Sequence, residues 1–396
     1  MNKDIILLHL SLIDGIGPIT VKKILEKVQG GFDLQDLYRL KTADFADLFG
    51  LSRSIAEKLS QGLQDKTALQ KEYDLIQKND ITFVSLANKN YPQLLANIYA
   101  PPIILYWQGV DILNAEKKVA FVGSRKAHRY GEKVIHMLVP DLVKAGCVIV
   151  SGGAIGADSM AHRATVNCGG KTIAILGSGL LKPYPYSNRR LFDDIVQKGG
   201  AIVSSFPLQT EAKPGNFPAR NRIIAGLSIG CVVVQAAAKS GACITAQCAL
   251  DEGRDVFAIP GPIDDELSQG CHNLIGQGAK LVGCSEDILV EMGCCVRSVE
   301  VKNKSPRKKV AEKPNRKNNL QCVAEHVNNY ENDNSIEGSI VRCCKNPCST
   351  DEIAAVLDMQ ILEIHELLFN LQLDGRIKQN HAGMWESIGL IFCKER

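Results

Sequence analysis

The sequence predicts an α/β protein built around an extended Rossmann-like, doubly wound and mostly parallel sheet. Two observations predict this fold. Within residues 78–294, short aliphatic and β-branched runs alternate with segments of helical periodicity. The flanks show helical periodicity instead, which predicts a small helical domain over 1–77 and a winged-helix domain over 320–396. Residues 295–319 are polar and basic and contain two prolines, so we expect a basic linker there.

The N-terminal segment contains two helix–turn–helix patterns. Apolar residues around Leu7–Leu12 precede Gly15-Ile16-Gly17-Pro18, and helical spacing resumes from Val21 to Val28. A weaker repeat surrounds Gly50-Leu51-Ser52. The segment therefore resembles a sterile-alpha-motif or helix-hairpin-helix bundle. A glycine turn of this kind can expose backbone N–H groups to a phosphate, and the alternative of a tight packing turn stays open for the first unit.

Nine β-rich runs account for the predicted sheet, and helical patterns fill most of the gaps between them. In sheets of this class, ligands bind beyond the carboxyl ends of the strands. The clearest helical patterns cover 131–145, 158–168 and 242–252. The predicted strands are Ile81–Leu86, Ile103–Trp107, Val119–Val122, Val148–Val150, Thr172–Leu176, Ala201–Ser204, Cys231–Gln235, Asp255–Ile259 and Ala279–Val282.

The C-terminal segment has the order helix, turn, helix and small hairpin. Ser349 or Thr350 is a helix start signal, and a second amphipathic stretch runs from Ile361 to Leu371. The predicted wing pairs 377–379 with 384–386 and turns at 381–383. The second helix carries Glu363, His365 and Glu366, where a DNA-reading helix is normally basic. We therefore expect a protein-contact or regulatory role for this domain.

The composition excludes several classes of protein. The formal net charge is only +3, so a nucleic-acid surface must be local. The 14 cysteines follow no disulfide framework or zinc spacing, which predicts reduced thiols and no metal. No apolar run approaches about 18 residues, and the N-terminus lacks a signal-peptide layout. We expect a cytoplasmic protein with no membrane span.

Glycine-rich loops follow several predicted strands. Glycine lets a backbone approach a phosphate closely, and the N–H groups at the following helix start favour an anion. Arg125 adds a fork of donors suited to phosphate oxygens. The alternative is that the glycines only permit tight turns, which leaves Arg125 unexplained. The residues that form this predicted cradle are Gly123, Ser124, Arg125, Gly152, Gly153, Gly156, Ser240 and Thr245.

Missing motifs exclude some classes of phosphate ligand, and one basic segment favours a nucleic-acid strand. Neither a Gly-x-Gly-x-x-Gly nor a P-loop sequence is present, so we expect no nucleotide cofactor. Segment 213–222 places Phe217 among Lys213, Arg220 and Arg222, beside Asn221. An aromatic ring can stack on any base while cations hold the backbone. Alternatively, Phe217 is a core residue and Arg222 a salt-bridge partner.

The order of these motifs resembles the DNA-processing protein A (DprA/Smf) family over about Tyr91 to Val290. Relatives often carry glutamate where this chain has Phe206 and Gln235, and Ser-Leu at Ala242-Cys243. The motifs that carry the resemblance are Gly123-Ser124-Arg125, Ser151-Gly152-Gly153-Ala154-x-Gly156-x-Asp158-x-x-Ala161-His162, Gly177-x-Gly179 with Tyr184-Pro185-x-x-Asn188, Phe217-Pro218-x-Arg220-Asn221-Arg222, Ser240-Gly241-x-x-x-Thr245-Ala246 and Pro260-Gly261.

The resemblance implies a non-enzymatic protein of natural transformation and recombination. Family members bind single-stranded DNA on the Rossmann-like domain, form homodimers through it, protect incoming DNA and load the recombinase RecA. By motif matching, the Arg125 loop would line the DNA pocket, and Phe217 to Arg222 would supply stacking and backbone contacts. Lys182, in the loop that follows Gly177, is a further DNA-binding candidate.

Two competing functions stay open from the sequence. One is a nucleotide phosphoribohydrolase of the lysine-decarboxylase-like superfamily, with Asp158 as the acid and His162 assisting. That family's Pro-Gly-Gly signature is missing, because Pro262-Ile263 follows Pro260-Gly261. His162 is also explained as a helix residue that is hydrogen-bonded in the core, and we favour that interpretation. The other competitor is a pure adaptor whose Rossmann-like domain binds no ligand.

Overall fold

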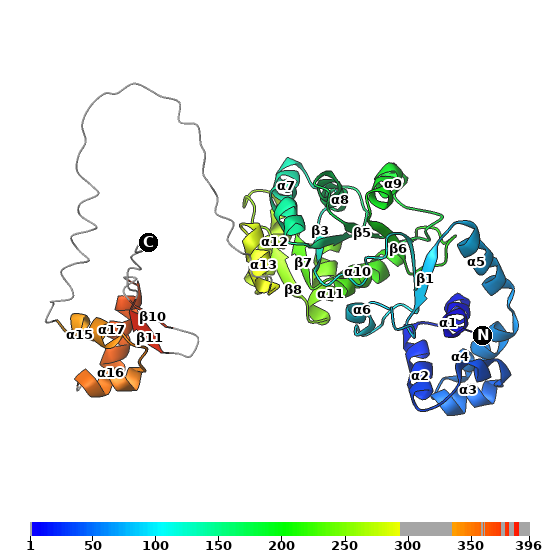
Figure 1. The fold of residues 1–396 in the computed structure, drawn as a ribbon, viewed down its shortest axis with the longest axis horizontal. Helices are drawn as coiled ribbons and strands as arrows, with labels where there is room; N and C mark the ends of the chain where they lie inside the picture. Colours follow the sequence, from blue (N-terminus) through cyan, green and yellow to red (C-terminus); the bar gives the residue numbers. More distant parts are fainter. Residues whose placement is uncertain are drawn as a thin grey trace, which may run out of the picture. The chain divides into compact units, whose positions relative to one another are not determined.

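The computed structural model describes residues 2–293, 335–357, 359, 361–373, 377–379 and 384–387 (Figure 1). The chain divides into two compact units, Met1–Val301 and Lys302–Arg396, which we describe separately. The predicted linker at 295–319 and the predicted wing turn at 381–383 lie outside the described residues. None of the described helices has the length and apolar character needed to cross a membrane.

The N-terminal helices pack onto the sheet that follows them in the chain. Pro18 begins the second helix at a position where its missing N–H is harmless, and Gly50 ends a later helix in the left-handed region at φ 59°. One buried apolar cluster includes Leu8 and Phe45 from these helices and Tyr106 from the sheet. The elements are α1 (Lys3–Leu12), α2 (Pro18–Gln29), η1 (Leu34–Arg39), α3 (Thr42–Phe49), α4 (Arg53–Gln64) and α5 (Thr67–Lys78).

A nine-stranded sheet forms the centre of the first unit, in the order β1-β2-β6-β5-β4-β3-β7-β8-β9. All nine predicted strands are confirmed. From β6 to β9 in this sheet order, every strand pairs in parallel with its neighbour. At one edge of the sheet, β2 pairs antiparallel with β6, and β1 pairs antiparallel with β2. The prediction of a mostly parallel sheet is therefore confirmed. The strands are β1 (Thr82–Ser85), β2 (Ile104–Gly109), β3 (Lys118–Val122), β4 (Val148–Ser151), β5 (Thr172–Ile175), β6 (Ala201–Ser204), β7 (Gly230–Val233), β8 (Asp255–Ala258) and β9 (Lys280–Leu281).

Helices cover both faces of this sheet, as the doubly wound prediction requires (Figure 1). Helices α7, α8 and α13 pack on one face, and α10, α11 and α12 pack on the other. The covering elements are α6 (Gln93–Ala96), α7 (Arg129–Lys144), α8 (Ala157–Asn167), η2 (Tyr186–Asn188), α9 (Arg189–Gln197), α10 (Asn216–Leu227), α11 (Gly241–Asp251), η3 (Glu266–Ser268), α12 (Gln269–Gly276) and α13 (Ser285–Glu291).

The chain reverses its winding direction at β3. This strand pairs with β4 on one side and with β7 on the other, so the loops that leave β3 and β7 diverge. Such a switch point opens a crevice at the carboxyl ends of the strands, where doubly wound proteins bind their ligands. The topology therefore places the candidate site beside the loops after β3, β4 and β7.

The second unit contains three described helices and a two-stranded antiparallel sheet, which matches the predicted winged-helix pattern. Ser349 caps its second helix, since the Glu352 N–H donates to Ser349 Oγ at 3.2 Å and the Ser349 N–H donates to Glu352 Oε2 at 2.7 Å. Trp385 packs in the apolar core of the unit. The elements are α15 (Ile336–Cys343), α16 (Thr350–Leu357), α17 (Ile361–Leu373), β10 (Ile377–Gln379) and β11 (Trp385–Ser387).

Candidate functional site

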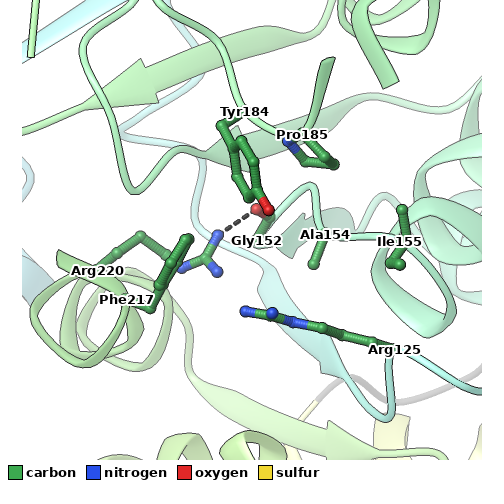
Figure 2. Close-up of a pocket in the computed structure, with 8 residues that line it drawn as sticks. All are labelled: Arg125, Gly152, Ala154, Ile155, Tyr184, Pro185, Phe217 and Arg220. Carbon is green, nitrogen blue, oxygen red and sulfur yellow. Dashed lines mark hydrogen bonds between the residues drawn. The ribbon is translucent and has the colours of Figure 1, made fainter. Parts of the chain in front are cut away.

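Two adjoining cavities open at the carboxyl ends of the central strands. The larger cavity has a volume of about 350 Å³ and runs between the loop after β3 and the start of α11. The smaller cavity adds the loop after β5 to its lining (Figure 2). The residues that line both cavities are Arg125, Ala154, Phe217 and Arg220. We therefore treat the two cavities as one site.

Phe217 lies at the centre of this site, in the first turn of α10. The Cζ atom of Arg125 is 5.2 Å from its ring centroid, and that of Arg220 is 5.9 Å away. The Tyr184 ring lies 5.9 Å from it at an angle of 50°. Gly177 leaves the space that the ring occupies, because a Cβ there would lie 2.9 Å from Phe217 Cδ1. Phe217 is thus half-buried at a cavity wall and is not a core residue.

Arg220 is a fixed cation beneath the ring. Its side chain is buried, and Nη1 donates to the carbonyl oxygens of Gly152 and Ile175, the latter at 2.7 Å. Its Nε donates to Asn221 Oδ1 at 3.2 Å. Burial lowers the pKa of the guanidinium, and the nearby Asp158 carboxylate opposes that shift. Arg220 therefore supplies positive charge to the site from a position that solvent hardly reaches.

The first turn of α8 places a carboxylate against the loop after β4. Asp158 is buried, and its Oδ2 accepts the Ala154 N–H at 3.3 Å. Burial raises the pKa of Asp158, with Arg220 acting in the opposite direction. A Cβ on Gly152 would overlap both the Arg220 guanidinium and the Asp158 carboxylate. Gly152 is therefore required for close packing, and the loop donates its Ala154 N–H to the Asp158 side chain at the start of α8.

The loop after β3 carries the exposed cation of the site, Arg125. Its backbone packs against Gly156, which has φ 81°. A Cβ on Gly156 would overlap the carbonyl groups of Ser124 and Arg125, so only glycine allows this close approach. The Ala157 N–H also donates to Ser124 O at 3.1 Å. These contacts fix the base of the loop while the Arg125 side chain extends toward Phe217 (Figure 2).

Most of the predicted site residues meet at these cavities. Ser240 caps α11 by accepting the Cys243 N–H at 3.4 Å, and Thr245 in the same helix is buried. Lys182 and Lys213 are exposed and are not among the lining residues. The predicted residues that line at least one of the two cavities are Gly123, Ser124, Arg125, Gly152, Phe217, Arg220, Asn221, Ser240 and Thr245.

The other predicted residues have different surroundings. Gly153 is buried with φ 64°, and a Cβ there would lie 2.7 Å from the Phe192 ring. Arg222 lines a separate cavity that also includes Gly17 and Pro18 at the start of α2. The first glycine turn of the N-terminal domain thus faces the same helix, α10, that carries Phe217.

Three residues that line only the smaller cavity were not predicted as part of the site. Ile155, Tyr184 and Pro185 contribute to the smaller cavity, and Tyr184 is 47% exposed. Tyr184 and Pro185 belong to the motif after Gly177, but the sequence does not show that this long loop turns back toward α10. The signal available was an aromatic residue close to a glycine-rich strand end.

His162 lies outside both cavities and is fully buried. Its Nδ1 is 2.7 Å from the hydroxyl of Thr172, which itself donates to Ile149 O at 2.7 Å. The hydroxyl proton is thus already used, so Nδ1–H must be the donor to Thr172. Burial lowers the pKa of His162 to about 3, and the Arg220 charge adds to the effect. The geometry supports a packing role over the catalytic alternative.

This histidine predicts a pH dependence of stability. The folded pKa of about 3 lies below the ordinary value of 6.5, so the unfolded chain binds the proton first as the pH falls. Above pH 6.5 the neutral histidine makes its full contribution to stability. As the pH falls below 6.5 toward 3, each pH unit lowers the free energy of unfolding by up to about 1.4 kcal/mol. Urea unfolding of the wild type and of His162→Gln at several pH values measures how steeply the free energy of unfolding of each protein changes with pH. His136→Gln, at an exposed position, is the matched control, and equal slopes for all three proteins would refute the prediction.

Comparison with known proteins gives a consistent result. The family described as DNA recombination-mediator protein A matches residues 82–293. The DNA processing protein DprA of Streptococcus pneumoniae is 40% identical over 275 residues, which cover 69% of this chain and 94% of that protein. The Bacillus subtilis DprA is 40% identical over 213 residues, covering 54% and 71% of the two chains.

One solved structure shows the same relationship. The crystal structure of the Streptococcus pneumoniae protein superposes with a TM-score of 0.64 at 38% identity, covering 74% of this chain and 99% of that one. A structure of the Helicobacter pylori DNA processing protein A, solved to describe its single-stranded DNA binding mode, is 30% identical with a TM-score of 0.48 over 53% of this chain and 95% of that one.

Proposed function

The chain belongs to the DNA recombination-mediator protein A family, and from this premise we propose that it binds single-stranded DNA without altering it chemically. The strand would cross the carboxyl ends of β3, β4 and β7, with a base against Phe217 and phosphates near Arg125. We further propose that the bound strand is protected and is passed to the recombinase RecA during transformation and recombination.

The observation that carries this proposal is the grouping of Phe217 with two guanidinium groups at a cavity wall. A base of any identity can stack on an aromatic face, and arginine can pair with phosphate oxygens in a forked geometry. A lone metabolite would need instead a pocket that encloses it on most sides. An open site with two aromatic rings and an exposed arginine suits a polymer.

The same geometry favours unpaired DNA over a duplex. In a duplex the base faces are stacked on one another and cannot reach a half-buried ring. Stacking on Phe217 and phosphate contact with Arg125 do not distinguish one base from another, so we propose limited base preference. Affinity should then depend on strand length and salt concentration more than on sequence.

A direct binding experiment tests this function. Fluorescence anisotropy would compare an oligothymidine of about 20 nucleotides with a duplex of equal length and with thymidine monophosphate. We expect tight binding of the single strand and weak binding of both competitors. Chromatography after incubation with nucleoside monophosphates tests the phosphoribohydrolase alternative. Release of free base, together with no binding of the oligonucleotide, would refute the proposal.

The partners require separate tests. A homodimer would present two sites to one strand and so raise its affinity for long oligonucleotides. Sedimentation of the free protein tests the dimer. RecA loading is tested by the lag before RecA-dependent ATP hydrolysis on single-stranded DNA, which the protein should shorten. An unchanged lag in the presence of bound protein would refute a loading role.

A further inference from the structure

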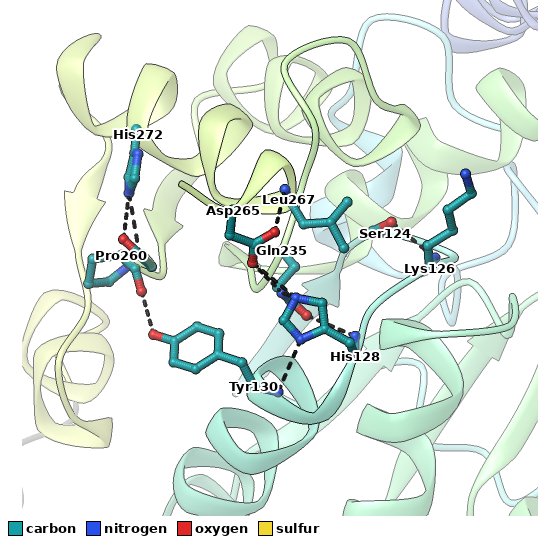
Figure 3. Close-up of polar contacts among 10 residues, drawn as sticks. Ser124, Lys126, His128, Tyr130, Gln235, Pro260, Asp265, Leu267 and His272 are labelled. Atoms are coloured by element: carbon teal, nitrogen blue, oxygen red, sulfur yellow. Dashed lines mark hydrogen bonds and ion pairs between the residues drawn. The ribbon is translucent and has the colours of Figure 1, made fainter. Parts of the chain in front are cut away.

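A buried residue behind the site contacts both ends of the Arg125 loop, one through its backbone and the other through its side chain. The Ser124 N–H donates to the backbone oxygen of Gln235 at 2.6 Å, and the His128 N–H donates to the Gln235 side-chain Oε1 at 3.1 Å (Figure 3). The residues between these two anchors include the proposed phosphate contact Arg125. A single residue that follows β7 thus contacts both ends of the loop after β3.

The hydrogen bonds inside the loop leave one backbone donor for a ligand. The Lys126 N–H donates to Ser124 Oγ at 3.0 Å, and the Ala127 N–H donates to Ser124 O at 3.1 Å. Gln235 accepts the N–H groups of Ser124 and His128. Among these five consecutive residues, Arg125 alone has a backbone N–H for which the described part of the chain provides no acceptor. The anchored conformation therefore presents the amide and the guanidinium of one residue together.

A second layer fixes which way the Gln235 amide faces. Asp265 Oδ2 accepts a hydrogen bond from Gln235 Nε2 at 3.3 Å and lies 3.0 Å from His128 Nε2. His128 Nδ1 accepts the Tyr130 N–H at 3.3 Å, and His128 Nε2 also lies 2.9 Å from Gln235 Nε2, so this ring nitrogen contacts both Gln235 and Asp265. Asp265 is held in turn by the Leu267 N–H at 2.9 Å (Figure 3). With its nitrogen directed to Asp265, Gln235 must direct its oxygen to the loop.

The fold makes room for this amide. Gln235 is 1% exposed, and a Cβ on Gly131 in the first turn of α7 would overlap its Oε1. Burying a side-chain amide is unfavourable unless its polar atoms are paired, and here both are. Gln235 does not line either cavity of the site. Its effect on a ligand must therefore pass through the loop.

We propose that Gln235, oriented by Asp265, is a positioning residue that holds Arg125 in its DNA-binding conformation. The proposal rests on the proposed function but adds a specific dependence to it. Removing the amide would let the loop relax while leaving the Arg125 side chain intact. Removing the Gln235 amide should then weaken DNA binding only when the Arg125 side chain is present.

A double-mutant cycle with oligothymidine tests this dependence. We expect Gln235→Leu to weaken binding about 10-fold and to lower the salt dependence, as loss of a phosphate contact does. In the Arg125→Ala background the same substitution should weaken binding less than about 2-fold. Gln247→Leu is the matched control, because it removes an exposed glutamine that donates to Asp251 at 2.8 Å and should change neither quantity.

A milder variant keeps the test decisive if Gln235→Leu fails to fold. Asp265→Asn leaves Gln235 in place but removes the charge that orients it, and we expect a loss of about 3-fold, again absent with Arg125→Ala. Equal losses in both backgrounds, or no loss from either folded variant, would overturn the proposal. Failure of the wild type to bind the oligonucleotide would instead overturn the proposed function.

Discussion

Replacing Arg125 with alanine should weaken oligothymidine binding by about 10- to 100-fold, the range expected for a lost hydrogen bond to a charged group. Arg125 is the exposed cation beside Phe217, and its guanidinium lies 5.2 Å from the ring centroid. Each phosphate contact on single-stranded DNA contributes about 0.7 to the slope of log affinity against log salt. The variant should lower the magnitude of that slope by a similar amount, which anisotropy titrations at several salt concentrations measure.

The control for this experiment removes an arginine elsewhere. Arg53 lies on α4 and pairs with Glu57 at 3.0 Å on the exposed side of the N-terminal domain. Arg53→Ala changes the net charge equally, so it separates a local contact from a general charge effect. Equal affinities and slopes for the wild type and Arg125→Ala would mean that phosphates do not meet this loop.

Replacing Phe217 with alanine should weaken binding by about 5- to 100-fold without changing the salt slope, because stacking contributes about 1–3 kcal/mol per base. Phe217→Leu keeps an apolar side chain against Gly177 while removing the aromatic face. We therefore expect it to bind as weakly as the alanine variant but to melt close to the wild type. Anisotropy and thermal unfolding measure the two effects.

An exposed aromatic residue serves as the control. Tyr99 is 70% exposed, and it is not among the residues that line the two cavities, so Tyr99→Ala should leave affinity unchanged. If Phe217→Ala lowers the salt slope as much as Arg125→Ala does, the ring only supports the arginine. If Phe217→Leu binds like the wild type, stacking is not its contribution.

The sheet was predictable because its strands are locally distinct. Runs such as 119–122 and 231–235 are apolar, short and bounded by glycine, and they repeat between helical segments. The antiparallel direction of β1 and β2 was not predictable, since pairing direction depends on long-range register. The shared core between the N-terminal helices and Tyr106 likewise depends on tertiary packing.

The site was partly predictable for the same reason. Arg125 and Gly152 directly follow strands, so the topology alone brings them together. The burial of Arg220 was not visible, because its partners Gly152 and Ile175 are far from it in sequence. The hydrogen bond from the Ala154 N–H to Asp158 was not predictable either, because it depends on how the start of α8 lies against the loop after β4.

The site has a further consequence for how the protein unfolds. Its lining comes from segments that follow β3, β4, β5, β6 and β7, so no short fragment contains it. A ligand that binds there stabilises only molecules in which all five segments are in register. Oligonucleotide binding should therefore slow amide hydrogen exchange across the whole sheet, in strands far from the ligand as well as in the loops it touches.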